Sequence, residues 1–143
     1  MEMIRTLKET ALAFINGLEN TNAKEIAALF TESGEIYLPY NNKLFEDAIV
    51  GRKSIEQFYA QVFENFTQMS FDIIEIEESG NTGFLFLHFK GRISIGEGEY
   101  YCNNYYSTFR IEPDGLIKEY VEVFDPILAA RQLDLMDKII AKE

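Results

Sequence analysis

The sequence is poor in the two side chains that most often hold transition metals, because it contains one cysteine, Cys102, and one histidine, His88. A single cysteine cannot form a disulfide within the chain, which is typical of proteins from a reducing compartment. One histidine without a cysteine cluster gives no basis for a transition-metal site. We therefore expect a cytoplasmic protein that uses no metal and no organic cofactor.

Long apolar runs and positive charges are also scarce. No segment approaches the ~20 apolar residues that span a bilayer, and the charged stretch Met1 to Thr10 predicts a helix rather than a signal peptide. The chain has 13 lysines and arginines against 24 acidic residues, so its net charge is −11. Phosphate backbones and anionic lipids repel such a surface, and we expect neither nucleic acid nor membrane as a partner.

Apolar and aromatic side chains are abundant. With 143 residues, 47% of them hydrophobic, the chain is expected to form one domain, residues 1–143, with its own core. The aromatic residues are 12 Phe and 8 Tyr, with no Trp. Because tyrosine adds a hydroxyl to an apolar ring, this composition allows an aromatic cavity that also carries hydrogen-bonding groups.

Hydrophobic periodicity predicts mostly helices first and strands later. Apolar spacings of three and four predict helices at 3–18, 22–31 and 53–66, the second ended by Ser33-Gly34. Alternation and turn residues predict strands at 35–40, 71–77, 83–95, 99–111 and 116–124, with a polar loop over 41–47. Asp125-Pro126 predicts the N-cap and first turn of a closing helix to about residue 140.

This order predicts an α+β fold, in which three N-terminal helices lie on one face of a curved antiparallel sheet. The last four strands form a meander, and the early strand at 35–40 returns to it. A strongly bent sheet wrapped over helices leaves a conical hollow, which is a natural place for a small molecule.

Two segments carry a resemblance to a known family. Residues 51–59, GRKSIEQFY, resemble the opening of helix three in ketosteroid-isomerase-like proteins, also called nuclear transport factor 2-like. Residues 101–109, YCNNYYSTF, and 114–126, DGLIKEYVEVFDP, are similar to the SnoaL-like polyketide cyclases and most of all to the phenazine-biosynthesis A/B proteins. The resemblance implies a cone-shaped, cystatin-like sheet, a dimer, and acid–base chemistry on a carbonyl compound in the hollow.

Glu122 is the candidate catalytic residue. Strand alternation places Lys118, Tyr120, Glu122 and Phe124 on one face of the last strand, and the resemblance makes that face the inner one. In the phenazine proteins an acidic catalytic residue occupies the position that matches Glu122. Burial would raise the pKa of its carboxyl, as suits a general acid or base. The alternatives are a structural glutamate paired with Lys118 or a solvated rim residue.

Alternation and the resemblance together give a set of residues expected to face a ligand. The set is Leu38, Tyr40, Phe58, Tyr59, Asn103, Tyr105, Ser107, Tyr120 and Phe124. Tyr59 and Tyr120 are candidates to donate to a developing oxyanion, or else ordinary core tyrosines. Asn103 and Ser107 are polar on an otherwise apolar face, so they bond either a ligand or each other.

The chain also departs from the family's catalytic patterns. Leu38, Phe14 and Ser107 stand where ketosteroid isomerase has its base, its tyrosine and its oxyanion aspartate, so steroid isomerisation in that manner is not expected. His88 shares the outer sheet face with Phe84 and Phe86. Large apolar side chains on an outer face predict a covered surface, and we expect a homodimer through it, with the closing helix as the alternative cover.

Three functions remain open from the sequence. The first is an acid–base enzyme, of isomerase, cyclase or condensing type, that acts through Glu122 on a mostly apolar carbonyl compound. The second is a non-catalytic protein of the same fold that binds a small apolar or aromatic ligand or serves as an accessory. The third is a dimeric interaction module, favoured by the apolar outer sheet face.

Overall fold

A computed structural model describes residues 4–140. The first helix, α1 (Leu7–Glu19), begins at a capping box in which Thr6 Oγ1 accepts from the Glu9 N–H and Glu9 Oε1 accepts from the Thr6 N–H. One face of α1 is buried, centred on Phe14 and Ile15. The helix predicted at 3–18 is therefore confirmed, with its start a few residues later.

The second helix and the first strand differ from the prediction. Helix α2 (Ala23–Ala27) ends four residues early, and strand β1 (Phe30–Tyr37) already includes Ser33-Gly34. A side chain at Gly34 would meet the Phe30 ring and the Ile117 carbonyl at 3.0–3.1 Å. This glycine therefore permits a close approach inside a bulged strand rather than ending a helix.

The strands form one six-stranded sheet in the order β2-β1-β6-β5-β4-β3. The predicted meander is confirmed as four antiparallel strands, which are β3 (Met69–Ser79), β4 (Phe84–Gly96), β5 (Glu99–Ile111) and β6 (Ile117–Phe124). Strand β1 returns to the meander as predicted, but it pairs with β6 in parallel, so the sheet is not antiparallel throughout. Strand β2 (Ala48–Val50) pairs with β1 and was not predicted, because three residues give too little alternation to detect.

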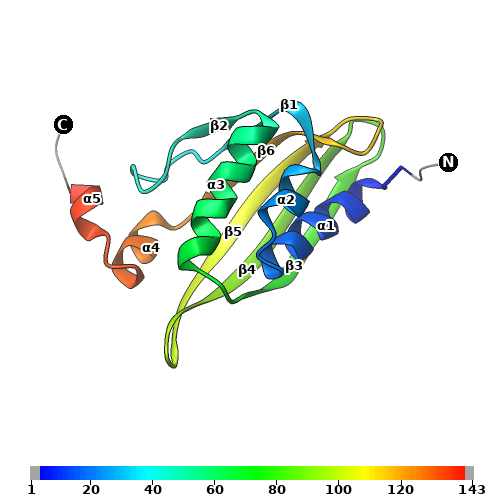
Figure 1. The fold of residues 1–143 in the computed structure, drawn as a ribbon. Helices are drawn as coiled ribbons and strands as arrows, with labels where there is room; N and C mark the ends of the chain where they lie inside the picture. The colour runs from blue at the N-terminus through cyan, green and yellow to red at the C-terminus, as the bar shows by residue number, and fades with distance from the viewer. Residues whose placement is uncertain (1–3, 141–143) are drawn as a thin grey trace.

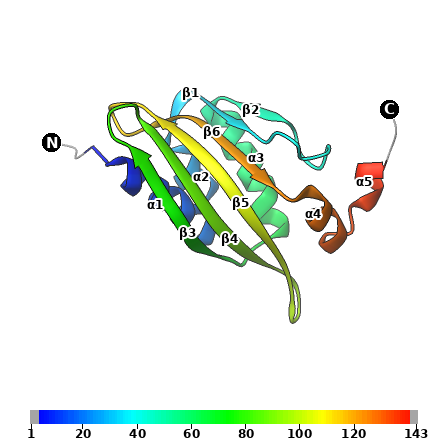
Figure 2. The same ribbon diagram turned by 180° about the vertical axis from the view of Figure 1, so that it is seen from behind.

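The helices cover one face of a curved sheet that does not close on itself. Figure 1 shows α1, α2 and α3 (Arg52–Asn65) in front of the sheet, and Figure 2, from behind, shows the opposite face of β3, β4 and β5 without a helix over it. Only α1 and α2 precede the first strand, since α3 lies between β2 and β3 in the chain. The α+β class is thus confirmed, although the helices are not all N-terminal to the sheet.

The closing segment consists of two short helices rather than one. Helix α4 (Pro126–Gln132) starts as predicted, with Asp125 Oδ1 accepting from the N–H groups of Ile127 and Leu128 and proline in the first turn. It ends at Leu133, and Asp134 adopts a left-handed conformation with φ 58° before α5 (Met136–Ile140). No helix between residues 4 and 140 is long and apolar enough to cross a membrane.

The sheet's inner face supplies most of the core. Alternate residues of β4 and β5 are buried, among them Leu85, Leu87, Phe89, Tyr105 and Phe109. The predicted inward position of Lys118 is wrong, because the pairing of β5 with β6 shifts between Arg110 and Ile111. Ile117 is buried in its place and Lys118 is exposed.

Candidate active site

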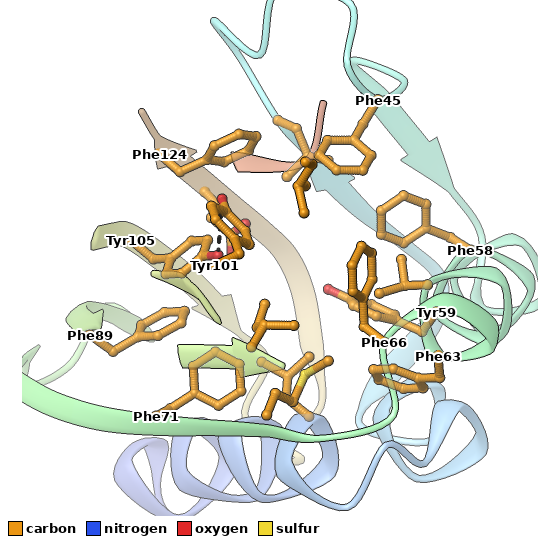
Figure 3. Close-up of a pocket in the computed structure, with 17 residues that line it drawn as sticks. Phe45, Phe58, Tyr59, Phe63, Phe66, Phe71, Phe89, Tyr101, Tyr105 and Phe124 are labelled. Atoms are coloured by element: carbon orange, nitrogen blue, oxygen red, sulfur yellow. Dashed lines mark hydrogen bonds between the residues drawn. The ribbon is translucent and has the colours of Figure 1, made fainter. Parts of the chain in front are cut away.

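The concave side of the sheet holds a cavity of about 110 Å³ beneath α3 and beside the segment that follows α4 (Figure 3). This volume exceeds several-fold the space that one water needs. Its lining is Leu18, Leu38, Phe45, Phe58, Tyr59, Val62, Phe63, Phe66, Met69, Phe71, Phe89, Ile93, Tyr101, Tyr105, Glu122, Phe124 and Leu133. The cavity is therefore an aromatic chamber whose polar groups are three phenol hydroxyls and one carboxyl.

Helical and strand periodicity explain how the lining is assembled. On α3, residues at spacings of one turn point into the cavity, and the Tyr59 and Phe63 rings stack with centroids 5.9 Å apart. On the opposite wall, Phe89 of β4 and its cross-strand partner Tyr105 of β5 stack at 5.1 Å. These paired rings give the cavity flat walls, which suit a flat ligand.

Glu122 is the carboxyl group of this cavity. It lies on β6 opposite Ser107 of β5, and its Oε1 accepts a 2.6 Å hydrogen bond from the Tyr120 hydroxyl. Burial among apolar side chains raises its pKa from 4.5 to about 7, and the bond from Tyr120 opposes that rise. Near neutral pH, Glu122 is therefore able both to take up and to release a proton.

The four tyrosines around Glu122 remain protonated at that pH. Burial, with the charge of Glu122 adding to it, holds the pKa of Tyr59 and Tyr120 well above its ordinary value. Burial has the same effect on Tyr105, and it raises the pKa of Tyr101 less strongly. Glu122 thus titrates alone among neutral phenols, which are hydrogen-bond donors rather than competing bases.

Three of the residues expected to face a ligand lie behind the cavity wall. Asn103 donates from Nδ2 to the Tyr101 hydroxyl at 2.7 Å and to the Asp125 carbonyl at 3.0 Å. Ser107 donates to the Leu87 carbonyl at 3.0 Å, and Tyr120 donates to Glu122. These side chains therefore satisfy protein groups and position the cavity residues, instead of lining the cavity themselves.

The other expected residues fall into two groups. Those that line the cavity with Glu122 are Leu38, Phe58, Tyr59, Tyr105 and Phe124. Tyr40 does not, since it is 82% exposed, and the prediction that it faces the hollow is wrong. Strand β1 ends at Tyr37, and Tyr40 lies in the following turn with φ 64°, so strand alternation no longer applies to it.

Some lining residues escaped the sequence reasoning. Tyr101 and Phe89 were not among the residues expected to face a ligand, although the alternation that marked Tyr105 applies equally to them. Phe63 was detectable as one helical turn beyond Tyr59. Phe45 lies in the loop between β1 and β2, where no periodicity indicates a direction, and only the folded chain places its ring 6.0 Å from that of Phe124.

The outer sheet face carries a different set of side chains. His88 lies there as predicted, bonded through Nε2 to Asn104 Oδ1 at 3.0 Å and stacked on Tyr106 at 4.0 Å. Phe84 and Phe86 are half-buried on the same face, and Cys102 is exposed. The histidine and the cysteine are therefore remote from the cavity.

Comparisons with known proteins agree with the resemblance seen in the sequence. The family model described as the SnoaL-like domain matches residues 11–120. No curated protein sequence matches the chain. Among solved structures, a Bacillus subtilis protein described as an isomerase is similar with a TM-score of 0.81 and 19% identity, over 90% of this chain and 93% of that one.

Two further structures are similar at the level of the fold. A phenazine biosynthesis-related protein from Pseudomonas aeruginosa has a TM-score of 0.76 and 20% identity, over 90% of this chain and 80% of its own. TerC, co-crystallised with polyporic acid, has a TM-score of 0.75 and 15% identity, over 90% of this chain and 98% of its own.

Proposed function

The chain belongs to the family of SnoaL-like domains, and on that premise we propose that it is an acid–base enzyme of the isomerase or cyclase type, with Glu122 as its proton carrier. The observation that carries the proposal is a single carboxyl in an aromatic cavity, with a pKa raised to about 7. A general base works best when its pKa lies near the operating pH. The remaining cavity groups are apolar or neutral donors.

The chemistry can be written with the residues present. The Glu122 carboxylate removes a proton from the carbon next to a carbonyl group, and the carbonyl becomes an enolate. A neutral phenol of the cavity wall donates a hydrogen bond to the negative oxygen and stabilises it. The Glu122 carboxylic acid then returns the proton to another carbon, and the substrate is isomerised with no change in oxidation state.

Tyr120 acts through Glu122 in this scheme. Its hydroxyl holds Oε1 at 2.6 Å and lowers the pKa of Glu122 against the effect of burial. The ring of Tyr120 is fully buried, wedged between Phe14 and Phe109 with centroid separations of 4.5 and 4.8 Å. A rigid donor of this kind fixes the direction of the carboxyl group.

The aromatic rings and phenol hydroxyls of the cavity walls support a particular class of substrate. Paired aromatic rings favour a flat, mostly apolar compound, and the phenol hydroxyls favour one that carries an oxygen. TerC, a fold relative, was co-crystallised with polyporic acid, which supports a small aromatic ligand for this chain. No metal or organic cofactor enters the proposed reaction.

A second candidate function is binding without turnover. It is favoured by the residues that stand at the catalytic positions of ketosteroid isomerase, because Leu38 and Phe14 are apolar and Ser107 bonds a backbone carbonyl. In that case Glu122 and the phenols would only recognise the ligand. The two functions differ in whether a proton is exchanged.

Hydrogen–deuterium exchange at carbon tests the proposal. A suitable probe is 2-tetralone, a flat aryl ketone whose enol is conjugated with the ring. The exchange of its C1 protons would be followed by NMR in heavy water. Wild type should accelerate exchange with a midpoint near pH 7, and Glu122→Gln should lose about 100-fold or more of that rate. Glu97→Gln, on the exposed hairpin, is the control that should retain it. Equal rates in wild type and Glu122→Gln, with binding intact, would favour the second candidate.

We also propose that the chain forms a homodimer through the outer sheet face and acts in the cytoplasm. Half-buried Phe84, Phe86, Val121 and Val123 support the interface, since they lie in a band on the outer face of β4, β5 and β6, where Phe86 and Val121 both pair with Thr108. An apolar band of this kind is costly to leave in water. The single cysteine is compatible with a reducing compartment.

A further inference from the structure

The hydrogen bonds around Tyr101 have a direction, and that direction leaves one donor facing the cavity. Asn103 Oδ1 accepts from the Asn104 N–H at 2.8 Å and from the Asp125 N–H at 3.3 Å. Its Nδ2 donates to the Asp125 carbonyl at 3.0 Å. These backbone partners fix which end of the amide carries the nitrogen, so the 2.7 Å contact between Nδ2 and Tyr101 Oη must be a donation by Asn103.

Tyr105 adds a second donation to the same oxygen. Its hydroxyl donates to Tyr101 Oη over 3.4 Å, which is a weak bond. Tyr101 thus accepts from both neighbours, and among residues 4–140 its hydroxyl proton has no acceptor. Because Tyr101 lines the cavity (Figure 3), that proton is available to a ligand.

We propose that Tyr101, held by Asn103, donates the hydrogen bond that binds the carbonyl oxygen of the ligand in this cavity. The inference rests on the proposed function for the identity of that oxygen. Tyr101 Oη accepts a short bond from Asn103 and a weak one from Tyr105, which leaves its proton for donation to a ligand. Tyr101 therefore favours a ligand oxygen that accepts a hydrogen bond, such as that of a ketone or quinone, over a ligand hydroxyl that has to donate one.

Tyr101 differs in this respect from Tyr59, Tyr105 and Tyr120, the other three phenols around Glu122. The Tyr105 hydroxyl donates its hydrogen bond to Tyr101, and the Tyr120 hydroxyl donates its hydrogen bond to Glu122. Tyr59 has no hydrogen-bond partner among residues 4–140, so its hydroxyl can accept as readily as it donates. Of the four, Tyr101 is the one whose neighbours dictate donation. Bonds accepted by a phenol also make it a stronger donor, as the bonds from Asn103 and Tyr105 do by opposing the rise of the Tyr101 pKa.

Infrared spectroscopy of bound 2-tetralone measures this hydrogen bond directly. Difference spectra between ligand with and without carbon-13 at the carbonyl isolate its stretch, which moves to lower frequency when the oxygen accepts a hydrogen bond. We expect a lower frequency in wild type than in Tyr101→Phe, and a 2-tetralone affinity weaker by about 3- to 10-fold in the variant. Tetralin, which lacks the oxygen, should bind both proteins equally.

Asn103→Asp tests the direction of the network without removing either phenol. A carboxylate at this position accepts from Tyr101, so the proton leaves the cavity and the carbonyl stretch should return toward its value in Tyr101→Phe. Tyr106→Phe removes a hydroxyl from the outer face of the same strand and is the matched control, with no expected shift.

Each result supports or overturns the inference. An unchanged stretch in Tyr101→Phe, a shift lost in Tyr59→Phe instead, or no binding of 2-tetralone at all would overturn it. The proposed function can fail separately: a Tyr101-dependent shift without exchange at C1 contradicts the enzyme and leaves the binding mode intact. Exchange that needs Glu122, without a Tyr101-dependent shift, contradicts only the inference.

Discussion

At the scale of single residues, burial raises the pKa of the Glu122 carboxyl, and this shift makes the stability of the fold depend on pH. The folded protein binds the Glu122 proton more tightly than the unfolded chain does, because the pKa is about 7 in the fold against 4.5. The stabilisation is full below pH 4.5 and is lost as the pH rises through 7. Because water in the cavity screens the charge of Glu122, the free energy of unfolding falls by about 2 to 3 kcal/mol over this pH range, less than the full pKa difference would give.

Glu122→Gln should remove this dependence, because the amide keeps the shape of the protonated acid and carries no charge. We predict that the variant matches wild type at about pH 5 and exceeds it by about 2 kcal/mol at about pH 8. Urea denaturation at both values measures the difference. Glu97→Gln should follow wild type throughout, and a variant less stable than wild type at the higher pH would contradict the prediction.

The site's residues were only partly predictable from the sequence. Glu122, Tyr105 and Phe124 follow from strand alternation, which survives where pairing is regular. Lys118 and Tyr40 did not follow it, since one sits at a bulge and the other in a turn with φ 64°. The hydrogen bonds of Asn103 could not be predicted at all, because they depend on Asp125, 22 residues away in the chain.

At the scale of elements, strand β4 must let two rings approach its backbone. A side chain at Gly91 would lie 2.8 Å from Phe71 Cε1 and 2.9 Å from Tyr105 Cε2. Both rings line the cavity, and Tyr105 is packed between Phe89 and Phe124. The absence of a side chain at Gly91 therefore allows the Phe71 and Tyr105 rings to lie directly against the backbone of β4.

We predict that Gly91→Ala lowers the free energy of unfolding by about 1 to 3 kcal/mol, as overpacking does. It should also weaken 2-tetralone binding, because the displaced rings narrow the cavity. Denaturation and calorimetric titration measure the two effects. Gly96→Ala on the same strand has its nearest neighbour, Glu99 Oε2, at 3.7 Å and should change little; equal effects of the two substitutions would argue against the account.

The elements themselves were predicted unevenly, for identifiable reasons. Strand β5 keeps its alternation over 13 residues, and its predicted bounds are confirmed, whereas β3 extends two residues beyond the predicted strand at each end. Helix α2 has five residues, and residues 28–31 continue its apolar pattern in the sequence although the chain turns at Ala28 and Leu29 and enters β1 at Phe30. The break in the closing helix depends on the left-handed backbone of Asp134, which the apolar spacing did not indicate.

At the scale of the whole molecule, as far as residues 4–140 describe it, helices cover one sheet face and not the other (Figure 1 and Figure 2). The uncovered face carries Phe84, with the Arg110 guanidinium 4.7 Å from its ring centroid, and Phe86 beside Tyr106. The meander was predictable because short connections leave few arrangements for consecutive strands. The curvature of the sheet and the volume of its cavity were not, since both depend on how particular rings pack.

If two copies pair through this face, light scattering at micromolar concentration should give twice the 16.5 kDa mass of the chain. Phe86→Lys places a charge in the middle of the band and should yield a monomer. Tyr40→Lys alters an aromatic residue that is already exposed, and it should leave the dimer intact. A monomeric wild type would refute the proposed interface.

The proton affinity of Glu122 underlies both the proposed reaction and the pH dependence of stability, and it can be measured without a substrate. Carbon-13 NMR resolves glutamate side-chain carboxyls, and the Glu122 signal is the one missing from Glu122→Gln. In Tyr120→Phe its midpoint should rise, because the lost hydrogen bond favoured the charged form. In wild type we predict a midpoint at about 7; titration at the ordinary value near 4.5 would contradict the account.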